Sequence, residues 1–228
     1  MKQKESEFVQ RLITWQAYSD ADFPWRKTKN AYRILVSELL LRKTTRKQVS
    51  RIYDTFFSKF PTIESLASSD EKVIMKTIMP LGMEYKRASA LKKIAKIVID
   101  SYGGKIPTTS KELMDLPCVG RYTSNALMCL AYGKDYPLLD TNAVRVITRV
   151  FSIKSSKIRP RDDSQMWNFV SSLIPSKKAR EFNLAVLDIA YSICHANNPG
   201  CQVCPLLCIC DHGSLGIRGS KTNPSMTY

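Results

Sequence analysis

Residues 113–144 read LMDLPCVGRYTSNALMCLAYGKDYPLLDTNAV, and this stretch decides the fold. A helical pattern is interrupted by a tight apolar turn at residues 116–120 and resumes at residues 122–132. Pro117 disfavours helix at the residue before it, and Gly120 can adopt a conformation barred to other residues. The pattern therefore predicts two helices joined by a short hairpin.

The hairpin has a chemical consequence. Where its turn enters the second helix, backbone N–H groups lack partners and suit a phosphate oxygen. Asp140 follows about 20 residues later, just before another apolar and basic helix. Two interpretations stay open on these residues alone. Asp140 is either an ordinary N-cap in a structural helical segment or a functional carboxylate beside a phosphate site.

The segments LPCVGRYT (116–123) and LLDTNAVRV (138–146) resemble the helix–hairpin–helix of the endonuclease III-like DNA glycosylases and the catalytic aspartate that follows it. Those enzymes cut the bond between a damaged or mispaired base and deoxyribose. The resemblance implies that Asp140 is catalytic and that Cys118 stands where the family motif LPGVG has its first glycine. It also implies DNA contacts at Pro117, Cys118, Val119, Gly120, Arg121 and Asn142.

The composition favours a nucleic-acid partner. The chain of 228 residues carries 35 basic and 20 acidic residues, a net charge of +15, and 44% hydrophobic residues. Residues 22–136 hold 21 of the basic and 11 of the acidic residues. A polyanion is the expected partner, although a merely soluble basic protein has the same balance. No apolar run reaches the roughly 18 residues of a membrane span, and MKQKESEF is no signal peptide, so we expect an intracellular, cytoplasmic protein associated with the nucleoid.

Apolar residues recur at helical spacing along the chain, and no strand pattern is evident, so the fold class is predicted to be all-α. One helical pattern, YRILVSELLL, contains Glu38 among apolar neighbours. Such a carboxylate is either a paired structural acid or an acid–base catalyst whose pKa burial raises. The charge run that begins at Arg42 and Lys43 is either a solvated face or a surface that faces DNA.

FPWRKTKNAYRILVSELLLRKTT (23–45) resembles the front of the adenine and thymine mismatch glycosylases, whose motif places a catalytic glutamate at Glu38. LGMEYKRA (81–88) resembles their minor-groove loop, which here opens a helix at Ala88. Arg42, Lys43 and Met83 match positions that wedge into or probe the opened duplex. Met83 could equally be a core residue.

Five of the seven cysteines lie within 17 residues. Cys194, Cys201, Cys204 and Cys210 have the spacing C-x6-C-x2-C-x5-C, which suits either zinc or a [4Fe–4S] cluster, and Cys208 is spare. The spacing is similar to that of the family's iron–sulfur module, so the resemblance implies a structural [4Fe–4S] cluster.

The resemblance extends to Cys210 and implies a domain organisation. A six-helix barrel with the helix–hairpin–helix is expected over residues 22–136. A helical iron–sulfur cluster domain is expected from residues 1–21 together with 137–210, followed by a flexible tail over 211–228. The protein is expected to act as a monomer.

Tyr122 bears on the reaction. Bifunctional relatives carry a lysine there, which forms a Schiff base and cleaves the strand. The tyrosine resembles that of archaeal-type thymine/uracil mismatch glycosylases. We therefore expect a monofunctional DNA glycosylase that excises thymine or uracil mispaired with guanine in double-stranded DNA, with weak or no strand cleavage. Two alternatives remain: an adenine glycosylase acting on A opposite G or oxidised G, and a non-catalytic iron–sulfur DNA-binding protein, which would not need Glu38 and Asp140.

Overall fold

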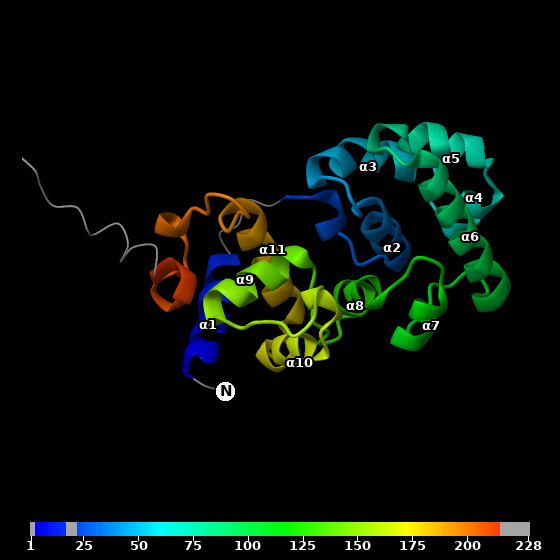
Figure 1. Cartoon of the computed structure of the whole chain (residues 1–228). Coiled ribbons are helices and arrows are strands. Elements are labelled where there is room, and N and C mark those ends of the chain that lie inside the picture. The colour runs from blue at the N-terminus through cyan, green and yellow to red at the C-terminus, as the bar shows by residue number, and fades with distance from the viewer. Residues whose placement is uncertain (1–2, 17–21, 215–228) are drawn as a thin grey trace, which may run out of the picture. The chain divides into compact units, whose positions relative to one another are not determined.

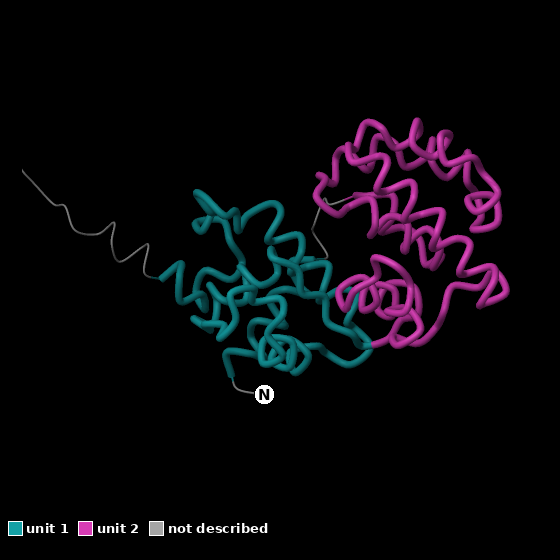
Figure 2. Tube along the Cα trace, turned by 45° about the vertical axis from the view of Figure 1, so that its right-hand side comes forward, with its two compact units in different colours: residues 1–21, 135–228 teal, residues 22–134 magenta. Residues whose placement is uncertain are grey.

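The computed structural model describes residues 3–16 and 22–214. Throughout these residues the regular elements are helices and no strand occurs, which confirms the all-α prediction (Figure 1). The chain divides into two compact units, shown in different colours in Figure 2. Unit 1 comprises Met1–Ala21 and Asp135–Tyr228, and unit 2 comprises Asp22–Lys134. No helix within the described ranges is both long and apolar enough to cross a bilayer.

Unit 2 is built from helices whose apolar stripes meet in one core. Helix α6 packs against α4 and α5, while α8 packs against α2 and α7. In α3 the spacing of Val49, Ile52 and Phe56 puts all three on one buried face. The helices of unit 2, with two 3-10 turns, are η1 (Pro24–Arg26), α2 (Ala31–Leu40), α3 (Arg46–Lys59), α4 (Ile63–Ser68), α5 (Glu71–Ile78), η2 (Met79–Leu81), α6 (Glu84–Tyr102), α7 (Ser110–Asp115) and α8 (Arg121–Leu130).

Side-chain caps set several of these helix starts. Thr45 and Gln48 form a reciprocal capping box at the start of α3, and Asp70 accepts from the backbone N–H of Lys72 at the start of α5. The start of α6 differs from the prediction. It begins at Glu84 rather than Ala88, so the expected loop is shorter and ends at Met83.

Unit 1 joins the N-terminal helix to the C-terminal half of the chain. Helix α1 packs against α11, and α11 packs against α9. The ring of Phe8 lies edge-on to Phe151 and to Phe182, with centroids 5.0 and 6.1 Å apart. The elements of unit 1 are α1 (Gln3–Gln16), α9 (Thr141–Phe151), η3 (Pro160–Asp162), α10 (Ser164–Leu173), α11 (Ala179–Ser192), η4 (Cys201–Val203) and η5 (Leu207–Ile209).

The flexible tail predicted over residues 211–228 lies only partly within the described residues and stays a prediction. Residues 211–214 are helical, and Asp211 forms an ion pair of 2.6 Å with Lys4 on α1. The rest of the predicted tail lies outside the described residues. The six-helix barrel and the cluster domain remain predictions.

Candidate functional site

The hairpin between α7 and α8 is closed by one backbone hydrogen bond, 3.1 Å long, from the N–H of Val119 to the carbonyl of Leu116. Pro117 is the second residue of this turn, and Cys118 is the third, with φ at +62°. A positive φ at the third position is where such turns usually place glycine. Gly120 has φ −101° and ψ −178°, an extended conformation open to any residue. The expectation that Gly120 supplies the unusual conformation is therefore wrong, since Cys118 does so.

The first turn of α8 offers backbone N–H groups as hydrogen-bond donors. Its N-cap residue, Gly120, offers no side-chain cap, and a Cβ atom at this position would meet nothing within 4 Å. Arg121, the first residue of the helix, is exposed. An open backbone at a helix N-terminus beside a cation can approach a phosphate closely.

Two loops of unit 2 carry the predicted probing residues. Lys43 follows α2 and Met83 precedes α6, and both have left-handed backbone conformations, with φ of +57° and +55°. Met83 is 48% exposed, so the alternative that it is a core residue is wrong. The guanidinium of Arg42 is exposed and donates to the carbonyl of Cys118 in the hairpin.

Glu38 lies on α2 and is 8% exposed. Its neighbour Ser37 is also buried and donates its hydroxyl to the carbonyl of Arg33 one turn earlier. Helix α2 packs against α8, which carries the half-buried Tyr122. The helices of two predicted catalytic residues are thus neighbours in unit 2.

Asp140 is the N-cap of α9 in unit 1. One of its carboxylate oxygens accepts from the backbone N–H of Ala143 at 2.7 Å, and the other accepts from the side-chain amide of Asn142 at 2.9 Å. The guanidinium of Arg145 donates to the amide oxygen of Asn142 and to the carbonyl of Cys194. Asp140 therefore caps α9, and its catalytic role stays a prediction.

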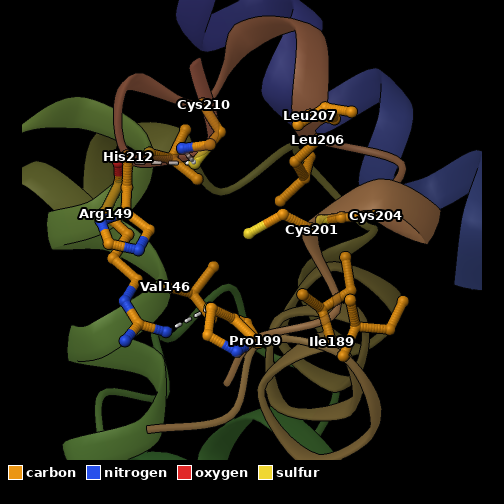
Figure 3. Close-up of a pocket in the computed structure, with 14 residues that line it drawn as sticks. Val146, Arg149, Ile189, Pro199, Cys201, Cys204, Leu206, Leu207, Cys210 and His212 are labelled. Carbon is orange, nitrogen blue, oxygen red and sulfur yellow. Dashed lines mark hydrogen bonds between the residues drawn. The ribbon is translucent and has the colours of Figure 1, made fainter. Parts of the chain in front are cut away.

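The four predicted cysteine ligands line one pocket of unit 1. Figure 3 labels three of them, Cys201, Cys204 and Cys210. The space between the lining atoms is about 370 Å³, part of it open to solvent. Cys208 is exposed and is not among the lining residues. Apart from Cys194, Cys201, Cys204 and Cys210, the walls are largely apolar and include Val146, Val150, Ile189, Ile193, Pro199, Leu206 and Leu207.

The pocket makes an isolated thiolate unfavourable. Burial raises the pKa of Cys204 to about 11 and also raises the pKa of Cys210, because a charged sulfur loses its water there. The negative charges of the neighbouring thiolates act in the same direction. Across residues 3–16 and 22–214, no three His, Cys, Asp or Glu side chains lie close enough together to hold a single metal ion.

Sequence reasoning missed three arginines that organise these segments. Arg145 and Arg149 are one turn apart on α9, and both donate to carbonyls of the segment that begins at Cys194. Arg149 also lies 3.3 Å from the sulfur of Cys194. The third arginine, Arg87, joins the loops of unit 2. Only the spacing of Asn142, Arg145 and Arg149 on one helical face gave a signal in the sequence.

Comparison with known proteins assigns the class. The model of the HhH-GPD superfamily of base excision DNA repair proteins matches residues 36–170, more than half of the chain. The chain belongs to this superfamily. The match runs from within α2 to within α10 and so includes the hairpin, Glu38 and Asp140.

Several known proteins are similar to this chain over most of its length. The chain is 43% identical to a thymine-DNA glycosylase of Aeropyrum pernix, over 88% of this chain and 91% of that protein. It is 44% identical to a thymine/uracil-DNA glycosylase of Pyrobaculum aerophilum, over 88% and 89%. A solved thermostable thymine-DNA glycosylase covers 93% of this chain and 97% of its own, with 38% identity and a TM-score of 0.88. The solved endonuclease III–DNA complex, at 23% identity and a TM-score of 0.78 over 96% and 100% of the chains, shares the fold.

Proposed function

We propose that this protein is a monofunctional DNA glycosylase that removes thymine or uracil mispaired with guanine from double-stranded DNA. The observation that carries the proposal is the 38–44% identity to three thymine or thymine/uracil-DNA glycosylases, over at least 89% of the length of each. Tyr122, at the position where a lysine would form a Schiff base, supports base release without strand cleavage.

The reaction breaks the bond between C1′ and the base nitrogen. The oxygen of water bonds to C1′, and the base leaves with a proton. Positive charge develops on the sugar during this step, as in other glycoside hydrolyses. Asp140, held by Ala143 and Asn142, stabilises that charge electrostatically, while Glu38 orients or protonates polar groups of the leaving base.

The base must leave the helix before this chemistry begins. The hairpin residues from Pro117 to Arg121 contact a phosphate, supported by the uncapped start of α8 and the open space at Gly120. Arg42, Lys43 and Met83 enter or probe the opened duplex, supported by their exposure. Asn142 contacts DNA beside Asp140, and one chain acts as a monomer.

We further propose that Cys194, Cys201, Cys204 and Cys210 hold a [4Fe–4S] cluster, which when bound cross-links the cysteine-rich loop. A tetrahedral zinc needs all four sulfurs about 2.3 Å from one ion, whereas each thiolate of a [4Fe–4S] cluster binds a different iron. The four thiols line one largely apolar pocket of unit 1, and their spacing is similar to that of the family's iron–sulfur module, which supports the cluster. With it, unit 1 is the cluster domain and unit 2 the six-helix barrel.

A cleavage panel tests the function. Labelled duplexes carrying T:G, U:G, A:G or A opposite oxidised guanine are incubated with the protein, and abasic sites are revealed by alkali; a T:A duplex and the Asp140→Asn variant are controls. We expect product from T:G and U:G only, and strand breaks only after alkali. Product from the adenine duplexes alone would instead support an adenine glycosylase. One relative of that name, from Buchnera aphidicola, is 31% identical, and the chain spans 58% of its length. Mismatch binding without any product would support a non-catalytic DNA-binding protein.

A further inference from the structure

Arg87 is a buried cation that contacts backbone carbonyls of unit 2. It lies on the first turn of α6 and is 8% exposed. Its Nε donates to the carbonyl of Gly82 at 3.0 Å, and Nη2 donates to the carbonyl of Arg42 at 2.6 Å. Its Nη1 donates to the carbonyls of Leu39 and Leu40 at 3.0 and 3.1 Å. One side chain therefore joins the end of α2, the loop that follows it and the loop before α6.

The positions of two of these carbonyls are informative. Arg42 directly precedes Lys43, and Gly82 directly precedes Met83. Lys43 and Met83 are the non-glycine residues of these loops that have a positive φ. A non-glycine residue in that region is strained, so it persists only where its surroundings hold it. Arg87 holds the peptide unit that leads into each of them.

The same network reaches the hairpin. The side chain of Arg42, whose carbonyl Arg87 binds, donates to the carbonyl of Cys118 at 2.9 Å. Cys118 has φ +62° and is, with Lys43 and Met83, one of the three non-glycine residues of unit 2 with a positive φ. Two arginines thus tie together all three strained positions of this unit.

We propose that Arg87 is a positioning residue that fixes the register between the loops carrying Lys43 and Met83 and, through Arg42, the hairpin. In this way it determines where the probing side chains stand when a mismatched base pair opens. The role in base-pair opening rests on the proposed function, whereas the control of loop register does not.

The chemistry of the arginine side chain supports this assignment. The planar guanidinium has five N–H donors in a fixed fork, which suits carbonyls arriving from several directions. Lysine carries the same charge on a single ammonium group with three N–H donors, so it cannot bind all four carbonyls at once. Burial, followed by the nearby charge of Arg42, lowers the pKa of Arg87, but an arginine stays protonated at neutral pH. The guanidinium therefore keeps all of its N–H donors at neutral pH.

The first experiment needs no activity. Hydrogen exchange is followed at the amides of Leu41, Thr44 and Gly82, which have backbone partners, in the parent, Arg87→Lys and Arg87→Met. Leu91→Ala is the control, because Leu91 is 2% exposed on the same helix and its apolar side chain has no hydrogen-bond donor. We expect exchange at the three amides to accelerate by about 10-fold or more in both Arg87 variants, relative to amides in α5, and not in Leu91→Ala. Equal local effects in the Leu91→Ala control, or none in the Arg87 variants, would overturn the proposal.

The second experiment reads the consequence on DNA. Single-turnover excision and 2-aminopurine fluorescence beside the mispair are measured at saturating protein, with fluorescence recorded in an Asp140→Asn background. We expect Arg87→Lys to lower both the rate and the fluorescence gain by about 10-fold or more, and Leu91→Ala to leave both near the parent values. Unchanged excision and fluorescence in Arg87→Lys would overturn the role in base-pair opening. If the parent excises neither thymine nor uracil, the proposed function fails, and the exchange experiment alone still decides the role in loop register.

Discussion

The guanidinium Nη1 of Arg42 donates a hydrogen bond of 2.9 Å to the carbonyl oxygen of Cys118, which lies 76 residues further along the chain. This contact links the loop after α2 to the hairpin before α8. It also uses the backbone of the one hairpin residue that departs from the glycine of the family motif. Both residues can therefore be tested for stability and for DNA binding separately.

Replacing Cys118 with glycine should stabilise the free protein. The left-handed conformation costs a non-glycine residue about 1–2 kcal/mol, and glycine loses about 0.5–1 kcal/mol more backbone entropy on folding, so a net gain of up to about 1.5 kcal/mol is expected. Urea denaturation measures this gain in the free energy of unfolding.

Gly120→Ala is the matched change, because the backbone of Gly120 is extended and a Cβ atom there has open space. It should alter stability little but weaken duplex binding if phosphate approaches the backbone there. A clear loss of stability in Cys118→Gly would contradict this account of the turn.

Arg42→Ala should weaken binding to duplex DNA and reduce the salt dependence of that binding. Each phosphate contact contributes roughly one unit to the slope of log affinity against log salt, so the slope should fall by about one. Affinity is measured by fluorescence anisotropy over a salt series. Lys76→Ala removes the same charge from an exposed position on α5 and serves as the control. The same loss of slope in both variants would show that only net charge matters.

Asp140→Asn separates the catalytic charge from the helix cap. Asparagine caps a helix about as well as aspartate, so the stability of α9 should persist. If the negative charge stabilises the sugar cation, single-turnover excision should fall by about 100-fold or more while mismatch binding survives. Asp70→Asn, at the exposed N-cap of α5, makes the same substitution elsewhere and should leave the rate unchanged. Persistent activity in Asp140→Asn would leave Asp140 as a cap alone.

Tyr122→Lys should convert base release into strand cleavage. A lysine amine near C1′ could bond to the opened sugar, lose water to form a Schiff base, and then permit elimination of the strand phosphate. Strand breaks should appear without alkali, and borohydride should trap a covalent protein–DNA adduct in this variant. The parent should give no adduct. An adduct in the parent would mean that another amine already serves, and the monofunctional assignment would be wrong.

We expect cysteines that line the pocket to be needed for iron binding, and Cys208, which does not line it, to be dispensable. Cys194→Ser or Cys210→Ser should lower iron content from about four per chain, reduce the broad visible absorption and give poorly soluble protein. Cys208→Ser should change none of these, because Cys208 is exposed and does not line the pocket. Stoichiometric zinc in a colourless, fully active parent would contradict the cluster.

Much of the helical structure was readable from the sequence by itself. The apolar spacing of α3 and the crowding of cysteines after Cys194 are local features, because the residues of one helix or one loop lie close together in the sequence. The net charge and the motif around Asp140 indicated DNA in the same way.

The tertiary structure alone decided the conformation of the loops and the partners of the arginines. The left-handed residue of the hairpin is Cys118 and not Gly120, and Met83 is exposed rather than in the core. Arg87 binds carbonyls up to 48 residues away, and Arg42 binds one at 76. The spacing of apolar residues cannot reveal such contacts, because every residue offers the same backbone carbonyl oxygen as an acceptor. Which donor reaches it depends on how distant helices pack.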